Sequence, residues 1–206
     1  MLSPNEKIFH QRLDQVLLNL ERMDFLSRSQ IQRLLQVSNV RNINRILLNM
    51  SKYLNSTRLN ENIYYLNKKG RDYIGSEKPP VKVKQLEHKL MRNDMYMYYD
   101  FPETWQTEHP IEWKGRHKKS HKIISDAFFF QGKSYYFVEV DHKQTMTANR
   151  SKIELYGQLF PTLEKEYGVD CVLLFYTTTE IRKQKLMEHC EKHRITCGVF
   201  TKEDMR

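Results

Sequence analysis

The chain has 206 residues, of which 39% are hydrophobic and 12% aromatic, and its formal net charge is +9. At about 100 to 200 residues per domain, this length predicts one or two compact domains. The composition excludes a disordered tail or a fibre, and the lack of any apolar run of about 18 residues excludes a membrane-spanning protein, so we expect no membrane partner.

The first residues mix charged and polar side chains and lack the apolar core and cleavage site of a signal peptide, so a cytoplasmic location is expected. The three cysteines, Cys171, Cys190 and Cys197, form no Cys-x-x-Cys pair. They predict reduced thiols rather than a disulfide framework or a zinc knuckle.

The positive charge is concentrated near the start of the chain. Residues 1–80 carry 13 Lys and Arg against 7 Asp and Glu, a net charge of +6, which leaves +3 for residues 81–206. Such an excess favours a polyanion as partner. The adjacent Pro79 and Pro80 follow two glycines and must interrupt a helix, so we expect two domains, residues 1–80 and 81–206.

The first domain begins with three predicted helices. Apolar residues three and four apart predict a helix over residues 5–23. Ser29 with Gln32 has the form of a capping box and predicts a second, short helix, which a short turn separates from the third. The third helix is expected from about 40 to 53, where the apolar spacing continues to Leu54.

The face of the third helix that points away from its apolar stripe is rich in Asn and Arg. Asn is a mediocre helix former, so helix propensity does not explain its repeated use here. Asn can bond the edge of adenine and Arg the edge of guanine in a major groove, which favours DNA recognition in a helix-turn-helix. The alternative interpretation is a solvated polar face.

Two short β runs, 56–59 and 63–66, follow with turn-forming residues between them and predict a hairpin. A hairpin directly after a helix-turn-helix is a wing, and Arg58 at its tip is a candidate phosphate contact. Winged helices also serve as dimerisation or protein-binding modules, and we expect a homodimer. The predicted DNA-binding residues are Arg28, Arg33, Asn39, Arg41, Asn42, Asn44, Arg45, Lys52, Arg58 and Lys68.

The second domain changes from a helical pattern to a mixed one. The expected elements are a helix at 81–99, strands at 105–113, 123–130 and 134–140, a helix at 145–167, a strand at 172–176, a helix at 181–193 and a strand at 195–200. The order αβββαβαβ predicts an α/β domain with a mixed central sheet flanked by helices on both faces. His117 and His121 lie in a Lys/Arg-rich run, which favours a solvated or phosphate-binding loop over a metal site.

Three carboxylates in this domain are candidates for chemistry. Glu139 and Asp141 lie two apart on one strand and so share a face, and Asp126 lies on the strand before. Carboxylates brought together repel one another unless a cation lies among them, and such a set suits Mg²⁺ or Mn²⁺. A divalent ion there could support phosphodiester hydrolysis.

The arrangement of Asp126 and Glu139-Val140-Asp141 resembles the PD-(D/E)XK nuclease fold, with Ser125-Asp126 where that motif has Pro-Asp. Asp141 stands where the motif has Lys, so a displaced lysine is required, from Lys143 or from Lys152 on the following helix. The resemblance favours Lys152. It implies catalytic roles for Asp126, Glu139, Asp141 and Lys152, with Mg or Mn held by the three carboxylates; the alternative is a degenerate site retained for DNA binding or dimerisation.

Across nearly its whole length the chain resembles the replication-relaxation family of plasmids and mobile elements. The resemblance rests on the order of five segments: Leu66 to Gly70, Glu87-His88-x-Leu90-x-x-Asn93-Asp94, SDAFFF, FVEVD and SKIELY. It implies a sequence-specific double-stranded DNA-binding accessory or regulatory protein of replication, maintenance or transfer. The alternative is a Mg/Mn-dependent endonuclease or nickase targeted by the winged helix, and no RNA-binding motif is visible.

Overall fold

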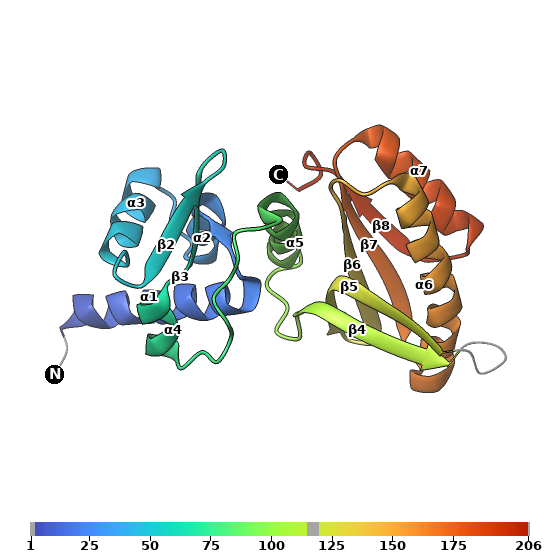
Figure 1. Ribbon diagram of the computed structural model, residues 1–206, viewed down its shortest axis with the longest axis horizontal. Helices are drawn as coiled ribbons and strands as arrows, with labels where there is room; N and C mark the ends of the chain where they lie inside the picture. Colours follow the sequence, from blue (N-terminus) through green and yellow to red (C-terminus); the bar gives the residue numbers. More distant parts are fainter. Residues whose placement is uncertain (1–2, 115–119, 206) are drawn as a thin grey trace. The chain divides into compact units, whose positions relative to one another are not determined.

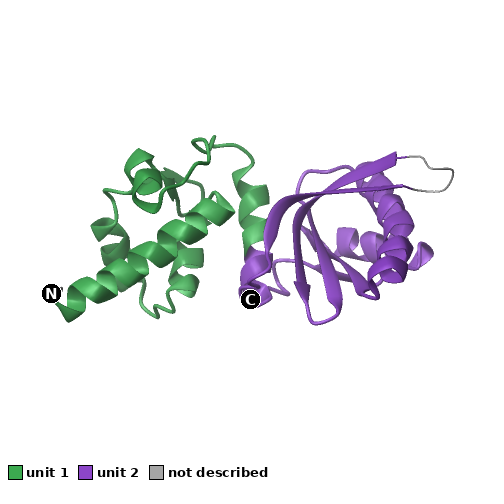
Figure 2. Cartoon of the chain, turned by 90° about the horizontal axis from the view of Figure 1, so that it is seen from below, with its two compact units in different colours: residues 1–93 green, residues 94–206 purple. Residues whose placement is uncertain are grey.

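The structure is a computed structural model that describes residues 3–114 and 120–205. It divides into two compact units, residues 1–93 and 94–206 (Figure 2). The division falls within α5 (Leu86–Tyr98), later than the boundary expected near residue 80. The start of α5 belongs to the N-terminal unit because Arg92 and Asn93 donate hydrogen bonds to the backbone carbonyls of Met23 and Phe25.

The N-terminal unit combines helices with a small sheet (Figure 1). Its elements before α5 are α1 (Pro4–Met23), β1 (Leu26–Ser27), α2 (Arg28–Leu34), α3 (Val40–Asn49), β2 (Leu54–Arg58), β3 (Asn62–Leu66) and α4 (Lys68–Ile74). The three strands are antiparallel in the order β1-β3-β2. The stripe predicted for α1 forms its buried side, apart from Ile8, which is 45% exposed.

Two predicted boundaries in this unit are wrong. The cap of α2 is Ser27, whose capping box is completed by Gln30 instead of the expected Ser29 and Gln32. Both pairs have the same spacing, and the Ser29 hydroxyl contacts Glu61 instead. Helix α3 ends at Asn49, so Lys52 follows the helix; the apolar spacing runs on because Leu54 is buried from β2.

The C-terminal unit contains a mixed five-stranded sheet in the order β4-β5-β6-β7-β8. Its elements after α5 are β4 (Gln106–Lys114), β5 (Ser120–Gln131), β6 (Ser134–Asp141), α6 (Met146–Tyr167), β7 (Asp170–Thr177), α7 (Glu180–Lys192) and β8 (Cys197–Phe200). β4, β5 and β6 pair antiparallel, and β7 pairs parallel with β6 and β8. The predicted order of helices and strands is confirmed.

Helices α6 and α7 lie over one face of this sheet (Figure 1). The core there includes Phe137, Tyr156 and Leu173. On the opposite face, Phe129 stacks on Tyr136 and on Trp105, so aromatic side chains from the segment after α5 cover part of the sheet. The architecture is therefore mixed α+β.

The predicted basic loop falls largely outside the described residues, which exclude 115–119 and with them His117. At its described end, His121 stacks on Trp113, and Lys122 donates to Glu112 on the neighbouring strand at 2.8 Å. Among the helices of the described ranges, none has the length and apolarity needed to cross a membrane.

Candidate functional site

The polar face of α3 has a partly structural origin. Asn39 caps the helix, because its side-chain oxygen accepts hydrogen bonds from the backbone N–H groups of Arg41 at 2.8 Å and Asn42. The Asn42 side-chain oxygen in turn accepts from the Arg45 guanidinium at 3.1 Å. Arg41, Asn44 and Arg45 are exposed. Capping thus explains Asn39, whereas the exposed Asn44 has no such local function.

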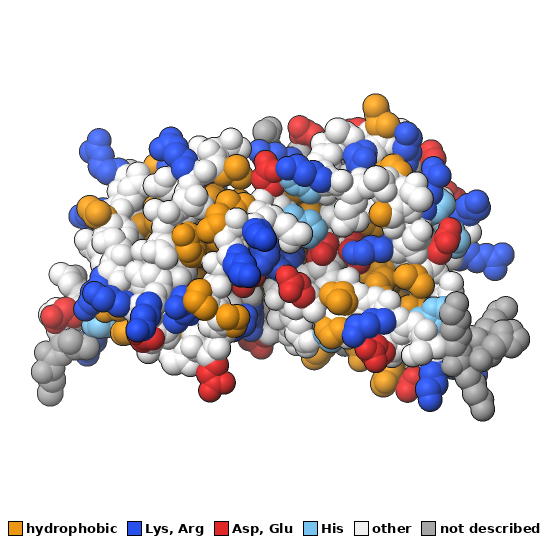
Figure 3. All heavy atoms as spheres, viewed as in Figure 1, with side chains coloured by type: hydrophobic (Ala, Val, Ile, Leu, Met, Phe, Trp, Pro, Cys, Tyr) orange, Lys and Arg blue, Asp and Glu red, His pale blue; other side chains and the backbone are white. Residues whose placement is uncertain are grey.

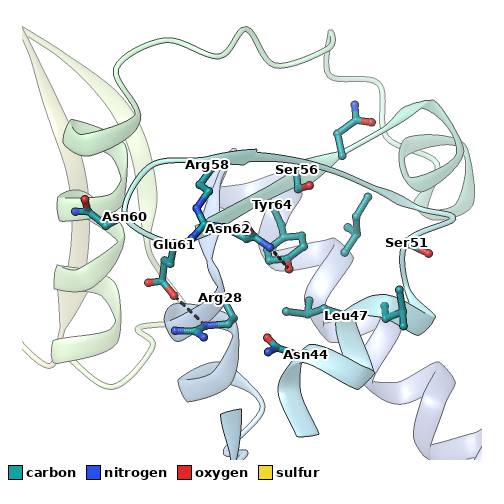
Figure 4. A pocket seen from close by; sticks show the side chains of 13 residues that line it. Arg28, Asn44, Leu47, Ser51, Ser56, Arg58, Asn60, Glu61, Asn62 and Tyr64 are labelled. Carbon is teal, nitrogen blue, oxygen red and sulfur yellow. Dashed lines mark hydrogen bonds and ion pairs between the residues drawn. The ribbon is translucent and has the colours of Figure 1, made fainter. Parts of the chain in front are cut away.

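A cleft of about 590 Å³ lies between α3 and the β2–β3 hairpin. Figure 4 shows Asn44 and Leu47 from α3, Arg28 from α2 and Tyr64 from β3 around it. Arg58, at the end of β2, also lines the cleft and is exposed. The cleft is therefore an open hollow bordered by arginines and amide side chains.

Arg28 in this cleft already has a carboxylate partner. Its Nε donates to Glu61 at 3.1 Å, and the same Glu61 oxygen accepts from the Ser29 backbone N–H at 3.1 Å. This carboxylate neutralises part of the charge that Arg28 could offer to a phosphate. Of the two arginines in the cleft, Arg58 is therefore the better placed to contact a phosphate.

The predicted DNA-binding residues do not all meet at one place. Arg28, Asn44 and Arg58 line the cleft. Arg45 lines a separate hollow between α1 and α3, and Arg33 lines another at the end of α2. Arg33, Lys52 and Lys68 are exposed but are not among the residues that line the cleft.

The net charge is carried by one of the two units. Residues 1–93 contain 17 Lys and Arg and 8 Asp and Glu, a net charge of +9, whereas residues 94–206 contain 17 of each and have none. On the face seen in Figure 3, basic side chains lie over the N-terminal unit near α3 and along α1 and α4. A polyanion is therefore attracted mainly to the N-terminal unit.

In the C-terminal unit, strand alternation directs Glu139 toward α6. The buried Glu139 carboxylate accepts a hydrogen bond from the Tyr156 hydroxyl at 2.7 Å and contacts the Lys152 ammonium group. On the neighbouring strand, Asp126 accepts from the Val140 backbone N–H at 2.8 Å, just beyond the last paired residues of β5 and β6. Lys152 therefore reaches the strand carboxylates from the following helix.

The Glu139 cluster consists of Asp126, Glu139, Lys152 and Tyr156, and its charges influence one another. Burial raises the pKa of Glu139 to about 8, and the Asp126 charge adds to this, whereas Lys152 and Tyr156 oppose it. Burial lowers the pKa of Lys152, but the two carboxylates outweigh that effect and raise it above its usual value. Lys152 therefore keeps its positive charge beside the carboxylates.

Asp141 is buried on the same face but belongs to a different network. The Arg182 guanidinium binds both of its oxygens, at 2.6 and 2.7 Å, Thr177 donates at 2.6 Å and Asn149 at 2.7 Å. Burial raises the pKa of Asp141, but the hydrogen bonds from Arg182, Thr177 and Asn149 outweigh burial and lower it. Arg182, Thr177 and Asn149 carry no local sequence signal that would have identified them.

The expectation that Asp141 shares an ion with Asp126 and Glu139 is corrected by this geometry. Within residues 3–114 and 120–205, the three carboxylates do not form a group within reach of one ion, and both oxygens of Asp141 are engaged. Asp126 and Glu139 remain as hard oxygen donors of the kind that Mg²⁺ and Mn²⁺ prefer. Both oxygens of Glu139 are also engaged, one by Lys152 and one by Tyr156, so an ion at this place would have to displace or share these contacts.

Comparisons with known proteins place the chain in a family. Among solved structures, protein VC1899 from Vibrio cholerae aligns with 10% sequence identity and a TM-score of 0.42, covering 100% of this chain and 55% of that one. The chain thus spans about half of its length. A search of curated proteins found no match. The family model described as replication-relaxation matches residues 17–172, which is more than half of the sequence, and the chain therefore belongs to the replication-relaxation family.

Proposed function

We propose that the chain is a sequence-specific double-stranded DNA-binding accessory protein of a plasmid or mobile element. Membership of the replication-relaxation family connects it with the replication of such elements. The observation that carries the proposal is the cleft between α3 and the β2–β3 hairpin, bordered by Asn44 and Arg58 in the unit that holds the whole net charge. The order α2, α3, β2, β3 is that of a winged helix.

In this proposal α3 enters the major groove and the hairpin follows the DNA backbone. Arg41, Asn44 and Arg45 are exposed on α3 and have the side chains that read guanine and adenine edges. Arg58 is exposed at the end of β2 and contacts a phosphate, which positions the protein without reading sequence. Each role predicts a different effect of mutation.

The test begins with selection of bound duplexes from a random library, followed by fluorescence anisotropy with the selected and a shuffled duplex. Arg45→Ala is expected to lose about 10- to 100-fold in affinity for the selected duplex and to relax its preference, since a base contact is worth about 1–3 kcal/mol. Arg58→Ala weakens binding to both duplexes alike. Lys122→Ala, in the unit without net charge, is the control. Equal affinity of the unmodified chain for both duplexes would refute the proposal.

A second function, metal-dependent DNA cleavage, is favoured by one observation: Lys152 lies against Glu139 beside Asp126. Asp126 and Glu139 are the residues that would hold Mg²⁺ or Mn²⁺. When bound, such an ion polarises a phosphoryl oxygen and lowers the pKa of an attacking water. Lys152 supplies a fixed positive charge next to the scissile phosphate.

Cleavage is tested by incubating the full chain with supercoiled plasmid and Mn²⁺. Asp126→Asn and Lys152→Met are each expected to reduce nicking at least about 100-fold, the usual effect of losing one stabilising charge at the reacting centre. Asp204→Asn is the control. Absence of cleavage, or cleavage that survives Asp126→Asn, would refute this second proposal. Neither result would bear on the proposal of DNA binding.

A further inference from the structure

A second group of possible metal ligands lies where α6 and α7 meet. Glu154 comes from α6, His189 from α7, and His193 caps the end of α7. One ligand atom from each of the three lies within 4.8 Å of the other two. His189 and His193 are four residues apart, on one face of the helix, and their ring centroids are 5.2 Å apart.

The two helices pack closely at this point. Gly157 lies one turn after Glu154 on α6, and a Cβ atom placed on it would lie 3.5 Å from the His193 Cβ and 3.8 Å from its Nδ1. His193 therefore packs directly against the backbone of α6. A carboxylate on one helix and an imidazole at the end of the other therefore lie near the same point.

One of the two histidines has a ring nitrogen without a hydrogen-bond partner. The Nε2 atom of His189 is buried and has no hydrogen-bond partner among the described residues. A buried polar atom without a partner is unusual, and coordination to a metal ion would use its lone pair. Burial lowers the pKa of His189, and His193, Arg150 and Lys192 lower it further.

We propose that Glu154, His189 and His193 bind a transition-metal ion of the zinc class that joins α6 to α7. Two imidazole nitrogens and one carboxylate oxygen are the ligands of Zn²⁺, Co²⁺ or Ni²⁺, whereas Mg²⁺ and Ca²⁺ prefer oxygen alone. Glu154 is exposed, which leaves a path for the ion and a fourth position for water. Both histidines lie beyond the residues matched by the family.

The surroundings of the site allow a further distinction. The positive charges of Arg150 and Lys192 act on His189 and oppose the binding of a metal cation there. The negative charge of Glu154 favours it. Neutralising Arg150 is therefore expected to strengthen binding, and neutralising Glu154 to weaken it. A thiol site at the nearby Cys190 and Cys197 would not require Glu154.

In the experiment, the full chain without a histidine tag is titrated with Co²⁺ and with Zn²⁺. The buffer contains a phosphine reductant that does not chelate these ions. One Co²⁺ per chain is expected, with visible absorption of a tetrahedral site, and Zn²⁺ is expected to raise the melting temperature. His193→Ala and Glu154→Gln each weaken binding at least about tenfold, since even changes outside the ligand shell typically cost about 10–100-fold. Arg150→Gln binds more tightly, and His10→Ala, in the other unit, is unchanged.

Two outcomes would overturn the proposal: no ion bound by the unmodified chain, or affinity unchanged in both His193→Ala and Glu154→Gln. Binding abolished by Cys197→Ser but retained in Glu154→Gln assigns the ion to the thiols and also overturns it. If His193→Ala fails to fold, Glu154→Gln decides, because its side chain is exposed.

Discussion

The buried Asp141 carboxylate connects four elements of the C-terminal unit. From the end of β6 it accepts hydrogen bonds from Asn149 on α6, Thr177 on β7 and Arg182 on α7. Both Asp141 oxygens are engaged, and the Arg182 guanidinium, which is 26% exposed, also donates to the Gln144 carbonyl at 2.8 Å. The Asp141 carboxylate therefore links the end of β6 to α6, β7 and α7.

Removing Arg182 leaves this carboxylate charged and unpaired in the interior. Arg182→Ala is expected to lower the free energy of unfolding by about 3 kcal/mol, measured by urea denaturation. Lys185→Ala, on the exposed side of the same helix, should change it by less than about 0.5 kcal/mol. With Asp141→Asn already present, the effect of Arg182→Ala should shrink; strictly additive losses would contradict a direct pair.

Asp204 gives a pH dependence of defined sign. Hydrogen bonds from Lys183, at 2.8 Å, and from Thr201 lower the pKa of Asp204 to about 2. Its folded-state pKa lies below the unfolded value of 3.8, so the stabilisation is present above pH 3.8 and is lost as the pH falls through 2. The melting temperature of Asp204→Asn should therefore lie below that of the unmodified chain at pH 6, with the gap closing toward pH 2. A gap that does not depend on pH would exclude this ionisation as the cause.

At the scale of the elements, the contacts of α4 explain why Asn67 and Gly70 occur in the segment from Leu66 to Gly70. Asn67 caps α4 by accepting from the Gly70 backbone N–H at 2.9 Å, and it donates to the Lys52 carbonyl at 3.0 Å. A Cβ atom on Gly70 would lie 2.3 Å from the Tyr53 carbonyl oxygen. The glycine thus allows α4 to pack on the turn that joins α3 to β2.

Gly70→Ala is accordingly expected to destabilise the protein by about 2 kcal/mol, because backbone atoms must move to admit the methyl group. Gly157→Ala is the matched control within a helix, since its nearest neighbour would lie at an ordinary 3.5 Å and alanine favours helix by about 0.5–1 kcal/mol. Urea denaturation of the two variants should give opposite signs. Equal effects would show that packing at Tyr53 is not the cause.

The elements also differ in how far sequence could predict them. Long apolar stripes located α1 and α6, and period-2 alternation placed Glu139 and Asp141 on one face of β6. The two residues of β1 are too few to show alternation, and two overlapping Ser-x-x-Gln pairs obscured the start of α2. These errors arise where local patterns are short or duplicated.

The candidate sites were predictable only where their residues are close in sequence. The contact of Lys152 with Glu139 follows from a strand and the helix after it, and it was anticipated by resemblance to a known fold. The pairing of Asp141 with Arg182 joins residues 41 apart, and Glu154 meets His189 across two helices. Such contacts depend on how the helices pack on the sheet, which spacing in the sequence does not encode.

At the scale of the whole molecule, the separation of charge between the units predicts which part responds to salt. Each phosphate contact adds about one to the slope of log affinity against log salt concentration. Arg58→Ala should therefore reduce this slope by about 1, whereas Lys122→Ala, in the unit without net charge, should leave it unchanged. Anisotropy titrations at several salt concentrations measure both, and an equal reduction would place phosphate contacts in both units.

The same charge separation affects how copies of the chain behave toward each other. With 17 charges of each sign, residues 94–206 contribute no net repulsion between copies at neutral pH, so the net electrostatic repulsion comes from residues 1–93. A polyanion that neutralises those residues removes this repulsion at the same time. In the proposed complex with DNA, several copies could then gather along one duplex at a lower electrostatic cost than the +9 charge of each free chain suggests.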